Sequence, residues 1–84
     1  MSRQKTPRPL LREKIEELRM RFNERRRVYG LSFNAMAEPC EVHRTTLTRF
    51  AHGYDVDVHT MEQIEAWLDD IEYWEAMRTL YGHA

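Results

Sequence analysis

One stretch of this chain, LSFNAMAEPCEVHRTTLTRFAHG at residues 31–53, constrains the fold more than any other. It contains two segments with the apolar spacing of short helices, joined by a turn of about four residues. Ala37 is a small residue at the point where the first segment meets the second, and Leu47 and Phe50 share one face of the second. The pattern predicts two helices joined by a tight turn, a helix-turn-helix, over about residues 32–52.

The other face of the second segment carries hydrogen-bond donors. They are Arg44, Thr45, Thr48, Arg49 and His52. Side chains of these types read base edges or hold phosphates in protein–DNA complexes. An apolar back and a donor-rich front are typical of a recognition helix, which lies in the major groove. The alternative is a solvated helix face in a regulator that does not bind DNA.

The residues of this stretch also match a known motif in register. They are Leu31-Ser32, Met36-Ala37, Val42, Thr46-Leu47-Thr48-Arg49, Phe50 and Gly53, preceded at matching spacing by Leu18, Phe22, Tyr29 and Gly30. On these residues the chain resembles the Cro/repressor family of phage and bacterial regulators, and its upstream part is similar to the lambda-type repressor domain. The resemblance covers about residues 10–68. It implies an all-α, five-helix, lambda repressor-like domain that binds double-stranded DNA.

The resemblance also implies roles for individual side chains. The residues expected at base edges are Arg44, Thr45, Thr48 and Arg49. The residues expected at backbone phosphates are His43, Thr46, His52 and Asn34. Either arginine at the front of the second helix could pair with guanine through two hydrogen bonds.

Three residues depart from the family pattern. Glu41 occupies a turn position where the family often has glycine, because the backbone there tends to be left-handed; a non-glycine residue in that conformation costs about 1 kcal/mol. Pro39 predicts an early stop or a distorted last turn in the first helix of the motif. Phe33 replaces a polar residue, and it is expected neither to donate to a phosphate nor to brace a recognition side chain. Together they predict an altered turn within the same fold.

The formal net charge of −1 conceals a division along the chain. Residues 1–50 hold 12 Lys/Arg and 6 Asp/Glu, whereas residues 51–84 hold 1 Arg and 8 Asp/Glu. A near-neutral total therefore does not argue against nucleic acid as a partner. The run at residues 25–27, Arg-Arg-Arg, is either a solvated helix face or a phosphate-facing one. The acidic end is expected to face away from DNA.

Residues 1–9 are interpreted as a flexible basic arm, and residues 10–84 as one DNA-binding domain. The basic side chains of the arm are Arg3, Lys5 and Arg8. Two interpretations of the arm are open. It either wraps into a DNA groove, as the arm of the lambda-type repressor does, or serves as a solubilising tail.

Five helices are expected, at about residues 10–29, 33–38, 43–52, 61–68 and 70–81. Pro9 suits the first turn of the first helix. The fourth helix is expected to start with a capping box at Thr60, and the fifth with a similar one at Asp69. Residues 54–59, YDVDVH, favour a loop; the alternative is a strand that could pair only across a dimer.

The expected fifth helix is rich in large apolar side chains. The candidates for a dimer contact are Trp74, Met77 and Tyr81. Large aromatic residues dominate small interfaces, and operators are often two-fold symmetric. The alternative is that the same side chains only cap the core.

Several other classes of function are disfavoured. A lone cysteine, Cys40, excludes an internal disulfide and suggests a reducing cytoplasm. No apolar run is long enough to span a membrane. Cys40 and His43 have the spacing of metal ligands, but no second cysteine accompanies them, so no metal, cofactor or small-molecule ligand is expected. No catalytic arrangement stands out, and we expect no enzyme.

The sequence thus predicts a small Cro-like transcriptional repressor of phage origin, which occupies an operator as a homodimer. Two alternatives remain. One is an antitoxin that represses its own operon and binds a toxin through its acidic helices. The other is a protein-interaction module, such as an antirepressor, that uses the fold without DNA.

Overall fold

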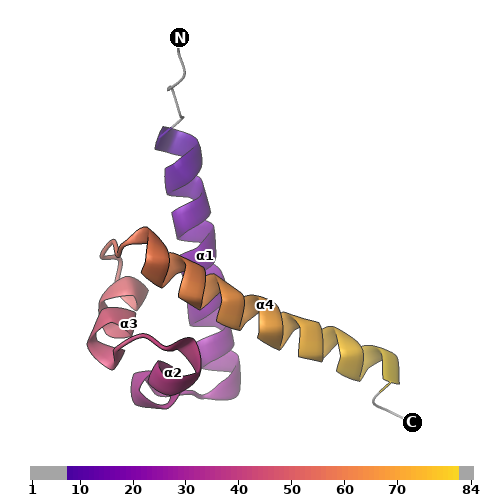
Figure 1. Cartoon of the computed structure of the whole chain (residues 1–84). Helices are drawn as coiled ribbons and strands as arrows, with labels where there is room; N and C mark the ends of the chain where they lie inside the picture. Colours follow the sequence, from indigo (N-terminus) through magenta and orange to yellow (C-terminus); the bar gives the residue numbers. More distant parts are fainter. Residues whose placement is uncertain (1–7, 82–84) are drawn as a thin grey trace.

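The computed structural model describes residues 8–81, except the side chains of residues 8–11. It contains four helices: α1 (Arg8–Tyr29), α2 (Phe33–Cys40), α3 (Arg44–Ala51) and α4 (Val58–Tyr81) (Figure 1). No strand occurs in this part of the chain, so the all-α class is confirmed and residues 54–57 form a loop. The prediction of five helices is wrong.

The expected arm falls mostly outside the described residues. Arg3 and Lys5 lie there, so their roles stay predictions. Arg8 is expected in the arm but is the first residue of α1. Pro9 follows it in the first turn of that helix, where a missing N–H leaves no intrahelical bond unmade.

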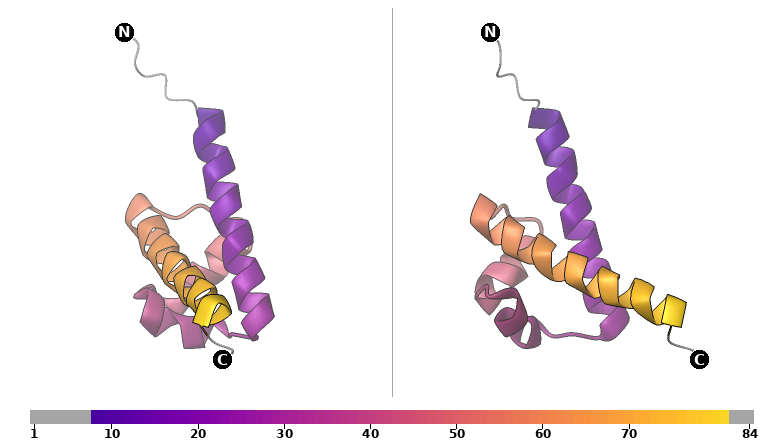
Figure 2. Two further views of the ribbon diagram at one scale, coloured as in Figure 1. Left: turned by 90° about the vertical axis from the view of Figure 1, so that its right-hand side faces the viewer. Right: turned by 45° about the vertical axis from the view of Figure 1, so that its right-hand side comes forward.

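The two long helices cross, and the two short helices pack beside the crossing. Helix α1 contacts α3 and α4, and α2 contacts the same two helices. The N-terminal end of α1 and the C-terminal end of α4 project from the crossing (Figure 1 and the right-hand view of Figure 2). The common core therefore lies where all four helices meet.

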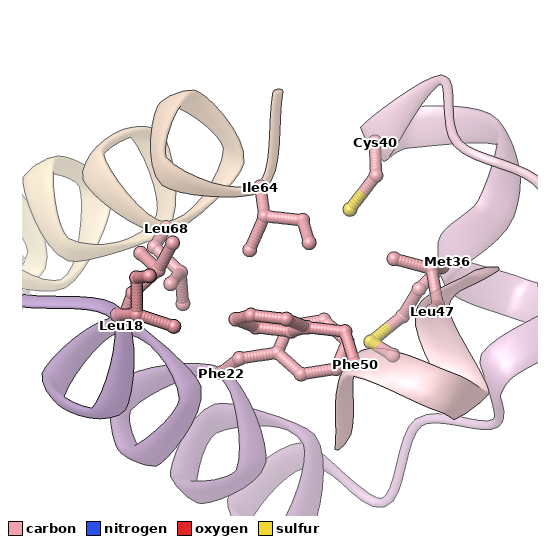
Figure 3. Close-up of a cluster of buried hydrophobic side chains, with 9 residues drawn as sticks. Leu18, Phe22, Met36, Cys40, Leu47, Phe50, Ile64 and Leu68 are labelled. Atoms are coloured by element: carbon pink, nitrogen blue, oxygen red, sulfur yellow. The ribbon is translucent and has the colours of Figure 1, made fainter. Parts of the chain in front are cut away.

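The core is a single cluster built around two phenylalanine rings (Figure 3). Phe22 of α1 and Phe50 of α3 meet edge to face with their ring centroids 5.7 Å apart. The buried apolar side chains are Ile15, Leu18, Phe22, Met36, Cys40, Leu47, Phe50, Ile64 and Leu68. Because every helix contributes to this cluster and α3 packs on α1 and α2, the position of α3 is fixed by the core.

Helix α4 runs unbroken through the point where a helix boundary is expected. No glycine or proline lies between residues 58 and 81, and aspartate inside a helix costs only about 0.7 kcal/mol relative to alanine. Asp69 does not begin a new helix; its carboxylate pairs with Arg21 of α1 at 3.0 Å. The change in apolar phase after Ile71 marks the place where the helix leaves the core.

Helix α4 also begins earlier than expected, at Val58. The Asp57 carboxylate accepts a hydrogen bond from the backbone N–H of Thr60 at 2.8 Å, which is the geometry of an N-cap. Hydrogen bonding from the side chain and the backbone of Thr60 holds the pKa of Asp57 below its usual value. The expected capping box at Thr60 is therefore wrong, because Asp57 supplies the acceptor one turn earlier.

The turn between α2 and α3 has the left-handed residue that the pattern predicts. Glu41 lies at φ 60° and ψ 40°. Its backbone N–H donates to Glu38 at 3.0 Å, and the Val42 N–H donates to Ala37 at 3.1 Å, which closes the helix. Pro39 does not stop α2 early: the helix continues through it to Cys40.

Candidate nucleic-acid interface

Helix α3 separates a buried back from an open front. Leu47 and Phe50 are both 0% exposed. Arg44, Thr45 and Arg49, all expected at base edges, have exposed side chains. The front of α3 is therefore available to a partner, while its back is immobilised in the core.

His43 lies just before α3, which begins one residue later than expected. Its Nδ1 atom accepts a hydrogen bond from the backbone N–H of Thr45 at 3.1 Å, so His43 is the N-cap of α3. From the sequence, His43 is expected only at a phosphate, and its capping role is not predicted. A polar side chain immediately before an apolar-periodic segment was the signal that could have revealed it.

Thr48 and His52 each form a hydrogen bond with a backbone carbonyl of α3. The Thr48 hydroxyl donates to the Arg44 carbonyl at 2.8 Å, and His52 Nδ1 lies 2.8 Å from the Thr48 carbonyl oxygen. Thr48 is half-buried, and its hydroxyl proton is used within the helix. Its remaining groups for a base edge are its methyl group and its oxygen lone pairs.

The residues expected at backbone phosphates lie on or next to α2 and α3. Asn34 of α2 and His52 are exposed, and Thr46 is half-buried. Asn34 is in the first turn of α2, where Ser32 caps the helix by accepting from the Ala35 N–H at 3.0 Å. The structure thus brings Asn34 to a helix N-terminus, which favours anions.

A buried arginine of α1 fixes the C-terminal end of α3. Arg19 is only 7% exposed, and its Nε donates to the Phe50 carbonyl at 2.6 Å. Its Nη2 donates to the Tyr54 carbonyl at 3.1 Å, and its charge is paired with Glu16. Asn23 of α1 adds a hydrogen bond to the Ala51 carbonyl at 3.1 Å. The carbonyls at the end of α3 are therefore satisfied by α1, and the helix is held at a fixed angle.

Phe33 has a role that is not predicted from the sequence. The guanidinium carbon of Arg26 lies 4.3 Å from the centre of the Phe33 ring, and the His52 ring centroid lies 6.4 Å from it. Phe33 cannot donate a hydrogen bond, but it does brace a basic side chain of α1 beside the end of α3. Tyr54 braces Arg49 in the same way, with 5.6 Å between the guanidinium carbon and the ring centre.

The remaining arginines of α1 are engaged by acidic side chains. Arg21 pairs with Glu72 at 2.9 Å, and Arg25 pairs with Glu75 at 2.9 Å. Tyr29 adds a hydrogen bond to Glu75, which raises the pKa of the phenol. Helix α4 therefore neutralises two arginines of α1, while Arg12, Arg19 and Arg27 pair with acids of α1 or of the loop before α4. Among the described residues 12–50, the basic side chains in no ion pair are Lys14, Arg26, Arg44 and Arg49.

An apolar groove lies on the projecting half of α4. It has a volume of about 940 Å³, and its lining residues include Tyr29, Leu31, Ile71, Trp74, Met77 and Tyr81. Trp74 is 63% exposed and Tyr81 is 72% exposed, while Met77 is half-buried. The three predicted dimer residues thus share one groove, to which the end of α1 also contributes.

Other kinds of site find no support in the described part of the chain. Cys40 is buried, and burial raises the pKa of its thiol to about 11, so the thiol is neutral. Residues 8–81 contain no group of three His, Cys, Asp or Glu side chains that could hold a metal ion. Nor does this part include a helix long and apolar enough to cross a bilayer.

Comparison of the chain with models of protein families, with curated proteins and with solved structures gives no match.

Proposed function

We propose that the protein is a sequence-specific duplex-DNA-binding repressor with a lambda repressor-like domain, and that α3 is its recognition helix. The observation that carries this proposal is the division of α3. Leu47 and Phe50 are completely buried, while Arg44, Thr45 and Arg49 are open to solvent on the other side. A helix presented in this way can enter a major groove without disturbing its own core.

The ends of α3 support the same proposal. Arg19 and Asn23 hold the carbonyl end, and His43 caps the amino end. A base-reading side chain needs a rigid support, because a displacement of about 1 Å already spoils a pair of hydrogen bonds. Arg26 and His52 both contact the Phe33 ring beside the end of α3, and they are our candidates for contact with the DNA backbone.

We further propose that the protein binds its operator as a homodimer. The groove with Trp74, Met77 and Tyr81 lies between α4 and the end of α1, and Trp74 and Tyr81 remain mostly exposed in it. Two copies joined through this groove would present two recognition helices to two half-sites. Repression would follow from occupation of promoter DNA in the cytoplasm of a bacterial host.

The antitoxin alternative requires acidic side chains of α4 that a toxin could bind. Glu72 and Glu75 are paired with Arg21 and Arg25 of the same chain. Glu62, Glu65 and Asp70 are exposed, so a toxin would have to bind through them. The antirepressor alternative predicts that no duplex binds, and the experiment below separates it from our proposal.

The test is selection of bound sequences from a random duplex library at low salt, followed by titration of the selected duplex. We expect one enriched motif, bound about 10³-fold or more tightly than random duplex. Lys14→Ala is a control for the loss of one positive charge outside α3, because Lys14 is exposed beside the N-terminal end of α4. Enrichment of no motif, with equal binding to all duplexes or to none, would overturn the proposal.

A further inference from the structure

The two histidines at the ends of α3 differ in the nitrogen that carries the proton. At the amino end, a backbone N–H donates to His43 Nδ1, so that nitrogen must present a lone pair. At the carboxyl end, His52 Nδ1 lies 2.8 Å from the Thr48 carbonyl oxygen, which can only accept, so that nitrogen must carry a proton. A neutral imidazole has one ring proton, so the two histidines are opposite tautomers.

This difference decides what each side chain offers to a DNA phosphate. Neutral His43 has its proton on Nε2 and can donate to a phosphate oxygen. Neutral His52 has a lone pair on Nε2, which repels the lone pairs of that oxygen. His52 can donate there in two ways. It can lose its bond to Thr48, or it can take up a second proton and keep that bond.

The second route depends on the phosphate itself, because the charged side chains near His52 are cationic. Arg26 of α1 lies over the Phe33 ring that His52 contacts, and Arg49 lies one helical turn before His52. Neighbouring cations oppose a second proton on an imidazole, so the negative charge of a phosphate must stabilise it. Among the described residues no carboxylate pairs with His52, so a phosphate would supply the missing counter-charge.

We propose that His52 takes up a proton when the protein binds duplex DNA, so that DNA binding tightens as the pH falls, whereas the contact made by His43 needs no added proton. This inference rests on the proposed function and adds a regulatory property to the same interface. One proton taken up on binding changes the affinity by about tenfold per pH unit where the free imidazole is neutral.

The test measures the affinity for the selected duplex by fluorescence anisotropy between about pH 5.5 and pH 8 at constant ionic strength. We expect wild-type affinity to fall with rising pH by up to about tenfold per unit. His52→Asn should remove this dependence, because its amide donates to phosphate at any pH. His43→Asn is the matched control: asparagine keeps the N-cap, and the pH dependence should persist.

Three results would count against the proposal in distinguishable ways. A flat wild-type profile, or an unchanged slope in His52→Asn, overturns it while leaving DNA binding intact. Failure to bind any duplex at every pH overturns the proposed function. Independently of DNA, nitrogen NMR shifts of the free protein should show neutral His52 protonated on Nδ1 and neutral His43 on Nε2; the reverse assignment overturns the proposal.

Discussion

The two halves of α4 have similar apolar content but very different surroundings. In the first half, Ile64 and Leu68 are 0% exposed and belong to the buried cluster that also contains Phe22 and Phe50. In the second half, Trp74 and Tyr81 project from the crossing of the helices and remain mostly exposed. The same continuous helix is thus a core element at one end and an open surface at the other. A change in the phase of apolar residues can therefore mark the edge of a core without marking a break in a helix.

The two halves of α4 should differ most in the loss of stability when a leucine is shortened to alanine. Leu68→Ala leaves a cavity in the core and should lower the free energy of unfolding by about 2–5 kcal/mol. Leu80→Ala, the same change in the projecting half, should alter it by less than about 0.5 kcal/mol. Urea denaturation of both variants at low protein concentration measures the difference. Equal losses would show that the second half is as tightly packed as the first.

A charge placed in the groove is expected to break association without unfolding the protein. Tyr81→Glu should give a folded monomer that binds a full operator about a hundredfold more weakly, because its two half-sites are no longer linked. Leu80→Glu is the matched control, since Leu80 is exposed beside Tyr81 but does not line the groove. Sedimentation at about 100 μM protein gives the oligomeric state; this is about 100 times a micromolar dissociation constant, so a dimer of that affinity would be fully formed. A monomeric wild type, free and on DNA, would contradict the dimer proposal.

Glycine substitutions should sharpen the comparison further. Ala66 and Ala76 are both exposed positions of α4, one in each half. Ala66→Gly should cost about 1 kcal/mol, because the first half must be helical for the core to form. Ala76→Gly should cost less in the monomer, because the projecting half can fray while the core stays folded. Hydrogen exchange should likewise be faster in residues 76–81 than in residues 60–68 of the monomer. Equal protection from hydrogen exchange in the two ranges would contradict the expected fraying of the projecting half.

The smallest effect is expected from acid. The pKa of Asp57 is lowered by its hydrogen bond to Thr60, and the pKa of Asp55 is lowered by its bond to Arg12. A lowered pKa contributes stability that is fully present above the unfolded value, near 3.8, and is lost as the pH falls through the folded value. Asp57→Asn keeps a capping acceptor but not the charge, so its stability should change less between neutral pH and about pH 3. If the free energy of unfolding falls equally with pH in the wild type and in Asp57→Asn, the Asp57 carboxylate does not contribute to acid sensitivity.

Local features of the fold were predictable from the sequence, because they depend on neighbouring residues. The two short helices and the left-handed residue between them follow from the spacing of Ala37, Leu47 and Phe50 and from the turn position of Glu41. The opposite faces of α3 follow from helical periodicity alone. These features would persist in almost any surroundings that bury the apolar face.

Features that depend on distant residues were not predictable. Asp69 could cap a helix or pair with an arginine, and only the position of Arg21, far away in sequence, decides between them. Arg19 looks like any surface arginine until α3 places the Phe50 carbonyl beside it. The same holds for Phe33, whose contacts come from α1 and from the end of α3.

The most direct test of α3 as a recognition helix is the specificity of Arg44→Ala. Its affinity should be measured for the selected duplex and for duplexes with each base pair changed in turn. We expect a loss of about 1–3 kcal/mol on the selected duplex and relaxed discrimination at one base pair, with little change on random DNA. An equal loss on selected and random duplexes would show that Arg44 only holds phosphate. An unchanged affinity on both would contradict the assignment of α3 as the helix that reads DNA.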